Sequence, residues 1–393
     1  MILVLSDFDM AVSGYQRICA SLCQELSKTK EVYVLGLNYG GTEHNYSFGV
    51  HPLLSISHVH EIIGLMLDDG IEIEALVVAM DLSLQIPIME SVNIPNKYFP
   101  YIGLFPVESP PILSAWAAKI SQMDAVLVMS EFGAKALEDD NGIPATFLPI
   151  GVDNNGVWVP PSPEHREAIR SGLGIDPDTF VVLTVADNQE RKNLSATAEI
   201  FSDMSVSVDS RSRSGMAMTV SPKRKTAWYV VTRPTSPVGW DFNDLLPRLG
   251  ILDRVSIYNR GIPDKLLWNL YAVADVFLLT SKAEGLALPV LEAMAVGLPV
   301  VVTDSTAMAE HVGDGERGYL IEADYHYIDP FGNGTRQLVS RTKGSELLSD
   351  LANRVSQGGD IGHEIRDRAI EYVAKRTYRN AAEITEAAIN KAI

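Results

Sequence analysis

The chain has 393 residues, of which 46% are apolar and 21% charged, so it is long enough to build two hydrophobic cores of ordinary size. No apolar run reaches membrane-spanning length, and the start Met1–Asp7 is too short and too acidic for a signal peptide. Composition therefore excludes a membrane-embedded protein and predicts a soluble, cytoplasmic one without stable membrane insertion.

The net charge of −18 is unevenly distributed. Residues 1–150 contain 18 Asp and Glu against 6 Lys and Arg, a net charge of −12, which repels phosphate backbones and anionic lipid headgroups. The two cysteines, Cys19 and Cys23, lie four residues apart on one predicted helix. This spacing favours a reduced, buried pair in a reducing compartment. The histidines show no metal-ligand spacing, so no metal site is expected.

Short buried strands alternate with helices along the first part of the chain. Helical spacing is seen in Tyr15–Ser27 and Ile112–Gln122. The predicted strands are Ile2–Leu5, Val32–Leu37, Ala75–Ala79, Tyr98–Leu104 and Ala125–Met129. This alternation is typical of a doubly wound, Rossmann-like α/β domain.

A second set of alternating elements follows a turn-rich stretch between residues 149 and 163, where we place the hinge. Its predicted strands are Val181–Val185, Trp228–Thr232, Val255–Tyr258, Val276–Thr280 and Val300–Thr303, and its predicted helices are Asn193–Phe201, Lys265–Ala272 and Leu288–Val296. We therefore expect an N-terminal Rossmann-like domain at 1–155 and a C-terminal one at 156–375. Residues 205–225 are expected to be a flexible insertion, and 376–393 a C-terminal helix.

The segment 281–302 carries the clearest chemical pattern. A buried strand leads into a loop with Glu284 and Gly285, and a helix with Pro289 near its first turn and Glu292 about one turn further follows. Both carboxylates can then reach a crevice at the carboxyl ends of the strands, beside the free N–H groups of the helix start. Such a site suits an anionic, polyhydroxylated ligand. Alternatively, the glutamates only stabilise a common loop-and-helix unit.

Two cations follow the strand Val181–Val185. Arg191 and Lys192 fall in a loop that opens a helix, where they can neutralise a phosphate. The other interpretation is a solvated basic pair without a role.

The ordered series Gly151-Val152-Asp153, Arg191-Lys192, Ala274-Asp275-Val276-Phe277-Leu278, the glutamate pair and Gly297-Leu298-Pro299 resembles that of the retaining glycosyltransferases of family 4. The resemblance implies a GT-B fold, in which two Rossmann-like domains face each other across a cleft. It also implies transfer of a sugar, with retention and without metal or cofactor, from a UDP- or GDP-sugar to an acceptor hydroxyl.

The resemblance also implies roles for individual residues. Glu284 would orient the sugar, Glu292 would bind the ribose hydroxyls, and Lys192 aligns with the family's lysine. Arg191 would supply the family's arginine charge from a shifted position. Glu108 stands where many members have a histidine, and would bind sugar or acceptor or merely begin the following helix. The catalytic set is thus Glu284, Arg191, Lys192 and Glu108.

Further donor-binding residues follow from the same resemblance. Gly14 would let the backbone approach the diphosphate or sugar, or is an ordinary turn glycine. Tyr258 or Arg260 would border the nucleotide base, or belongs to a plain turn. The donor-binding set is Gly14, Tyr258, Arg260, Gly285, Leu286, Ala287, Leu288 and Glu292. The helix at 376–393 would cross back to the first domain.

Two alternative functions remain open from the sequence. A sugar-nucleotide epimerase of similar fold would change the donor without an acceptor, and a non-catalytic glycan-binding protein would ignore nucleotides. The acceptor is not identified, although a glycan, a protein or a small molecule is favoured over DNA because of the acidic first half.

Overall fold

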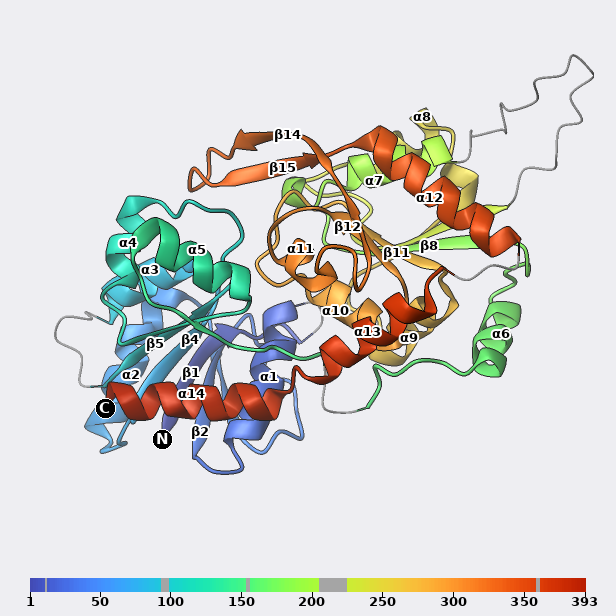
Figure 1. The fold of residues 1–393 in the computed structure, drawn as a ribbon. Helices are drawn as coiled ribbons and strands as arrows, with labels where there is room; N and C mark the ends of the chain where they lie inside the picture. Colours follow the sequence, from blue (N-terminus) through green and yellow to red (C-terminus); the bar gives the residue numbers. More distant parts are fainter. Residues whose placement is uncertain (11–12, 93–98, 153–155, 205–224, 358–360) are drawn as a thin grey trace, which may run out of the picture.

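The computed structural model describes residues 1–10, 13–92, 99–152, 156–204, 225–357 and 361–393. It contains two lobes, each built on one parallel sheet with helices on its faces (Figure 1). The predicted insertion at 205–225 lies outside the described residues except for Lys225, as does Asp153 of the linker motif. Within the described ranges, no helix is long and apolar enough to cross a membrane.

The first lobe has a seven-stranded sheet of order β3-β2-β1-β4-β5-β6-β7, parallel throughout. Its strands are β1 Ile2–Asp7, β2 Val32–Leu37, β3 Gly49–Leu53, β4 Ala75–Ala79, β5 Tyr101–Phe105, β6 Ala125–Val128 and β7 Thr146–Phe147. Its helices are α1 Gly14–Leu26, α2 Val59–Asp68, α3 Leu82–Ser91, α4 Ser114–Ile120 and α5 Glu131–Asn141, with a 3-10 turn η1 Ile56–His58. The central strands are apolar on both faces, since helices cover both.

The second lobe has a six-stranded parallel sheet of order β10-β9-β8-β11-β12-β13. Its strands are β8 Phe180–Val185, β9 Thr226–Val231, β10 Val255–Tyr258, β11 Val276–Leu279, β12 Val300–Thr303 and β13 Tyr319–Ile321. Its helices are α6 Pro163–Gly172, α7 Leu194–Met204, α8 Phe242–Arg248, α9 Asp264–Val273, α10 Leu288–Val296, α11 Thr306–Val312, α12 Arg341–Ser356 and α13 His363–Ala374, with 3-10 turns η3 Glu190–Lys192 and η4 Leu252–Arg254. An antiparallel hairpin, β14 Ala323–Ile328 and β15 Thr335–Val339, extends from this lobe.

Every strand expected from the sequence occurs in one of the two sheets, and β3, β7, β13 and the hairpin are additional. These additional strands were not predicted from the sequence because they lack a buried apolar run. β3 includes the exposed His51 and Pro52, and β7 has only two residues. A short or half-exposed edge strand is defined by its neighbour in the sheet more than by its own residues.

One expected helix boundary is wrong. The sequence predicted a helix over Ile112–Gln122, but α4 spans Ser114–Ile120. Residues 106–113 instead form an irregular loop, because the Pro110-Pro111 pair favours extended backbone in the residues before it. The alternative interpretation of Glu108 as a helix-start residue is therefore also wrong.

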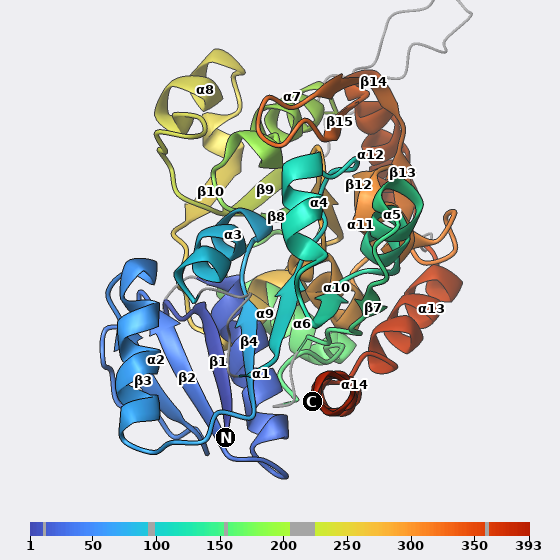
Figure 2. The same cartoon turned by 90° about the vertical axis from the view of Figure 1, so that its left-hand side faces the viewer.

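The chain crosses between the lobes a second time near its end. After α13 it turns, and α14 (Tyr378–Ala392) lies along the first lobe, where it packs against α1 and β6 (Figures 1 and 2). Thr377 caps α14 by accepting a hydrogen bond from the Asn380 amide at 3.2 Å. A Cβ at Gly151 would lie 2.4 Å from the Arg376 carbonyl oxygen. Glycine is thus needed where the two crossings meet.

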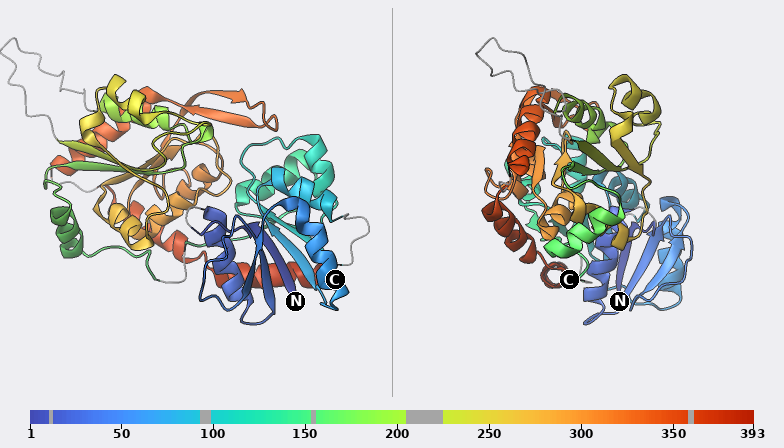
Figure 3. Two further views of the ribbon diagram at one scale, coloured as in Figure 1. Left: turned by 180° about the vertical axis from the view of Figure 1, so that it is seen from behind. Right: turned by 90° about the vertical axis from the view of Figure 1, so that its right-hand side faces the viewer.

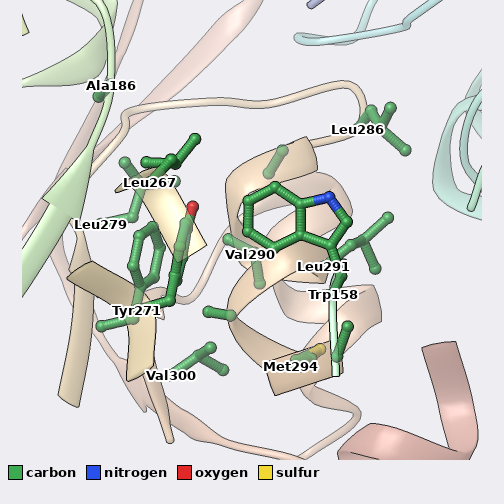
Figure 4. Close-up of a cluster of buried hydrophobic side chains, with 14 of the residues drawn as sticks. Trp158, Ala186, Leu267, Tyr271, Leu279, Leu286, Val290, Leu291, Met294 and Val300 are labelled. Carbon is green, nitrogen blue, oxygen red and sulfur yellow. The ribbon is translucent and has the colours of Figure 1, made fainter. Parts of the chain in front are cut away.

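Helix α10 occupies the centre of the second lobe. All its residues from Val290 to Val296 are buried, and Figure 4 shows Val290, Leu291 and Met294 beside Tyr271 and Trp158. The Tyr271 ring lies 5.3 Å from that of Trp158 and 5.8 Å from that of Phe277. Burial on this scale contributes roughly 1.5–3 kcal/mol of folding free energy per large side chain. This packing holds the helix that carries Glu292 in place.

The prediction of a buried cysteine pair without a disulfide is confirmed. Cys19 and Cys23 are both free and buried on α1, and their sulfur atoms lie 3.7 Å apart.

Candidate active site

Glu284 lies in the loop between β11 and α10 and is only 4% exposed. Its amide donates to the Thr306 hydroxyl at 2.9 Å, and its carbonyl accepts from the Ala307 amide at 3.2 Å. The start of α11 therefore anchors the loop, and the Glu284 side chain is held in a fixed position.

Four charged side chains from both lobes, Glu284 among them, form one network. Its carboxylate accepts from Lys192 Nζ at 2.5 Å and from Arg191 Nη1 at 2.9 Å. Arg191 Nη2 lies 3.0 Å from Glu108 Oε1, and Glu108 follows β5 of the first lobe. The structure thus brings all four residues of the predicted catalytic set into one network of two cations and two anions.

The charges in this network shift the pKa of each carboxyl differently. Burial by itself raises the pKa of Glu284, but the adjacent Lys192 and Arg191 lower it to about 2. Burial raises the pKa of Glu108, and Arg191 offsets only part of this effect. Burial and the neighbouring Arg191 lower the pKa of Lys192. Glu284 is therefore the firmly ionised carboxylate.

Gly285 follows Glu284 at a point of contact between the lobes. A Cβ there would lie 2.3 Å from Pro106 Cβ and 2.9 Å from the Val107 amide nitrogen. The absence of a side chain at Gly285 thus lets the first lobe approach closely, and its predicted role in donor binding remains a prediction.

The next three predicted donor-binding residues, Leu286, Ala287 and Leu288, form the turn into α10. Ala287 has a φ of 57°, and the Leu286 carbonyl accepts from His311 Nε2 at 2.5 Å. His311 Nδ1 therefore accepts from the Tyr372 hydroxyl, at 3.1 Å. Burial and the charge of Arg376 lower the pKa of His311 to about 3, so the ring is neutral. This neutral histidine fixes the backbone between the two glutamates.

Glu292 has a separate set of partners. Its Oε1 lies 2.9 Å from Arg17 Nη1 of the first lobe, and its Oε2 accepts from the Tyr271 hydroxyl at 2.8 Å. Arg17 also pairs with Asp264 at the start of α9. Burial raises the pKa of Glu292, although Arg17 and Tyr271 oppose this rise. The two glutamates are thus held by different groups.

Sequence reasoning missed Arg17, Asp264 and Tyr271. The available signal was the position of Arg17, one turn into the first helix and three residues after Gly14. Gly14 itself begins α1 after the capping Ser13. Among the described residues outside its own turn, no atom lies within 4 Å of the position of its absent Cβ.

Tyr258 and Arg260 lie at the end of β10, among contacts different from those of Glu284. Arg260 Nη1 lies 3.0 Å from Asp187 Oδ1, and Arg233 pairs with the same carboxylate at 2.8 Å. The Tyr258 ring lies 5.9 Å from that of Tyr229. Asp187, which follows β8, thus pairs with two arginines. The sequence did not predict Arg233, which lies in the loop after β9.

Within the described parts of the chain, no group of three His, Cys, Asp or Glu side chains is arranged to hold a metal ion.

Part of the chain is similar to a known protein family. Residues 243–353 match the family model "Glycosyl transferases group 1". The D-inositol 3-phosphate glycosyltransferase of Rhodococcus opacus (strain B4) is 29% identical over 205 residues, which are 51% of this chain and 42% of that protein. The chain thus matches less than half the length of this curated relative.

Solved structures match nearly the whole chain at low identity. Sucrose-phosphate synthase from Thermosynechococcus elongatus has a TM-score of 0.74 at 15% identity, and the match covers 98% of this chain and 97% of that one. Anabaena Alr3699/HepE, solved in complex with UDP-glucose, has a TM-score of 0.69 at 15% identity and 98% coverage of both chains. The GT-B fold expected from the sequence is confirmed by these structures, and residues 243–353 are similar to the group 1 glycosyltransferases.

Proposed function

We propose that the protein transfers a sugar from a nucleoside diphosphate sugar, a UDP- or GDP-sugar, to an acceptor hydroxyl. The observation that carries this proposal is the buried network of Glu284, Arg191, Lys192 and Glu108 at the contact between the lobes. The group 1 match and the UDP-glucose bound to a protein of the same fold support it.

The chemistry is a substitution at the anomeric carbon. The acceptor oxygen bonds to that carbon, the bond to the diphosphate oxygen breaks, and the diphosphate leaves with the electron pair. The acceptor's hydroxyl proton passes to the departing phosphate oxygen. Because negative charge grows on the diphosphate, fixed positive groups lower the barrier. We assign this role to Arg191, Lys192 and the free N–H groups at the start of α10.

The roles of the two glutamates follow from their positions. Glu284 keeps its charge and pairs with both cations, so it can orient the donor sugar beside them. Glu292 is assigned to the ribose hydroxyls, for which it must exchange one of its present partners, Arg17 or Tyr271. Retention of anomeric configuration and transfer without a metal ion are part of this proposal and rest on the resemblance to family 4.

Nucleotide-dependent thermal stabilisation tests the proposal. UDP, GDP and ADP, each with its hexose derivatives, are added to the native chain, to Lys192→Ala and to Glu292→Ala. A ligand at one hundred times its Kd stabilises the native chain by about 2.7 kcal/mol. We expect one base to stabilise the native chain and both variants to lose this effect.

The matched control is Lys343→Ala, which removes a lysine that is 52% exposed and pairs with Glu322. This variant should retain the nucleotide effect in full. If no nucleotide stabilises the native chain, or if Lys192→Ala responds as strongly as the native protein, the proposed function is wrong.

A further inference from the structure

The β14–β15 hairpin belongs to the second lobe but lies over the first (Figures 1 and 3). At its tip, the Phe331 ring lies 5.7 Å from the ring of Trp116 on α4. At the start of β15, the Thr335 amide donates to the Pro110 carbonyl at 2.8 Å. The hairpin is therefore a direct bridge between the lobes.

Two glycines fit the hairpin closely to the loop before α4. A Cβ at Gly334 would lie 2.4 Å from the Ser109 carbonyl oxygen. Gly332 has a φ of 83°, and a Cβ there would lie 3.2 Å from the Trp116 ring. Side chains at these positions would push the tip away, so the contact depends on glycine.

The same hairpin is attached to the glutamate loop. The Gln337 amide of β15 donates to the Lys282 carbonyl at 2.9 Å. The Lys282 ammonium lies 5.4 Å from the centre of the Tyr327 ring on β14. Since Lys282 is two residues before Glu284, the hairpin connects the predicted catalytic loop to the surface of the first lobe.

A pocket of about 250 Å³ lies between the hairpin and the first lobe. Its lining combines the aromatic pair Trp116 and Phe331 with Asp81, Glu108 and Arg191. Glu108 and Arg191 also belong to the network around Glu284. A molecule in this pocket therefore lies next to the position proposed for the donor.

Two residues that line this pocket each have a buried polar atom without a hydrogen-bond partner within the described parts of the chain. Arg336 lines it, is 7% exposed, and uses its Nε to pair with Asp329, yet its buried Nη1 has no hydrogen-bond partner among the described residues. The Ser109 hydroxyl, also at this pocket, is buried without a partner within the same residues. Buried donors of this kind are normally bonded, which points to a ligand that completes them.

We propose that this pocket is the acceptor site, that the hairpin forms one of its walls, and that the acceptor is a hexopyranoside. A pyranose has an apolar C–H face that packs on aromatic rings and hydroxyl groups that both donate and accept. Trp116 and Phe331 provide the aromatic rings. Asp81 and Glu108 can accept hydrogen bonds from the sugar hydroxyls, and Arg336 and Ser109 can donate hydrogen bonds to them. This inference rests on the proposed function. It identifies the class of the acceptor, and it identifies the hairpin as the element that selects the acceptor.

Saturation-transfer NMR with p-nitrophenyl glucoside, galactoside and mannoside tests the site on the full chain. At least one of these probes should bind the native protein. Trp116→Ala and Phe331→Ala should each weaken that binding by about tenfold. Nucleotide-induced thermal stabilisation, measured on the same samples, should persist in both variants because the rings line only the acceptor pocket.

Tyr325→Ala is the matched control, since Tyr325 is 68% exposed on the same hairpin, against 64% for Phe331, but does not line the pocket. It should bind the hexoside as the native chain does. Absence of hexoside binding to the native protein, or unchanged binding in both ring variants, would overturn the acceptor assignment. Absence of nucleotide binding in the native protein would instead count against the proposed function itself.

Discussion

Glu284 and Glu292 lie eight positions apart in one loop-and-helix unit and are about equally buried, at 4% and 3% exposure, yet their electrostatic environments differ. Glu284 pairs with two cations, Lys192 and Arg191, although Arg191 also pairs with Glu108, and its pKa falls to about 2. Glu292 shares one partly exposed arginine with Asp264, and burial raises its pKa. Because the two carboxyls are about equally buried, the comparison shows that their charged partners set the direction in which each pKa shifts.

Removing each carboxylate in turn should give the largest difference in stability between the two sites. Glu284→Ala leaves Lys192 and Arg191 in a buried site without their shared counter-charge, which should cost about 3–5 kcal/mol of unfolding free energy. Glu292→Ala should cost less, because Arg17 is 31% exposed and keeps Asp264. Urea unfolding at pH 7 measures both. An equal loss of unfolding free energy in the two variants would contradict the proposed difference between the two carboxyls.

The pH dependence of stability should have opposite signs for the two residues. The folded pKa of Glu284 lies below its ordinary 4.5, so its contribution is present above pH 4.5 and is lost as the pH falls toward about 2. The full effect is about 3 kcal/mol. Glu292 has a raised folded pKa, so its contribution is present below pH 4.5 and is lost as the pH rises through the folded pKa.

Unfolding curves of Glu284→Gln and Glu292→Gln across this pH range test the two signs. The gap between the native chain and Glu284→Gln should shrink as the medium becomes acidic, whereas that for Glu292→Gln should change in the opposite sense. Parallel curves for both variants would show that the two carboxyls do not differ.

His311, which holds the backbone between the two glutamates, gives the smallest expected effect. Its folded pKa of about 3 lies below the ordinary 6.5, so the stability it contributes is present above pH 6.5 and falls as the unfolded chain takes up a proton. Between pH 6.5 and 5 this loss is about 2 kcal/mol. His311→Gln should remove that part of the pH dependence in urea unfolding. A variant with the native pH profile would show that His311 plays no part in it.

Much of the fold could be predicted because its signals are local. The apolar runs that form β1, β4, β8 and β11 identify buried parallel strands, and the spacing of Leu288–Val296 identifies a helix. The elements that were missed, such as β7 and the β14–β15 hairpin, carry weak local patterns. Their strand structure depends on pairing partners that single-sequence patterns do not specify.

The candidate site, like the fold, could be predicted only in part. The residue types and order in the chain suggested Glu284, Lys192, Arg191 and Glu108, which the structure brings together. The sequence did not indicate that Arg17 would pair with Glu292, because 275 residues separate them. Nor did the sequence indicate that Pro106 of the other lobe would pack against Gly285.

The sequence by itself determined the two-lobed α/β architecture and the residues able to carry charge at its crevice, because strand burial, helix periodicity and chain order are local properties. Only the tertiary structure decided which charges meet across the lobes, in which direction the pKa of each carboxyl shifts, and that the hairpin carrying Phe331 packs on Trp116. These properties depend on distances between segments far apart in the chain, and on the exclusion of water that occurs when those segments pack together.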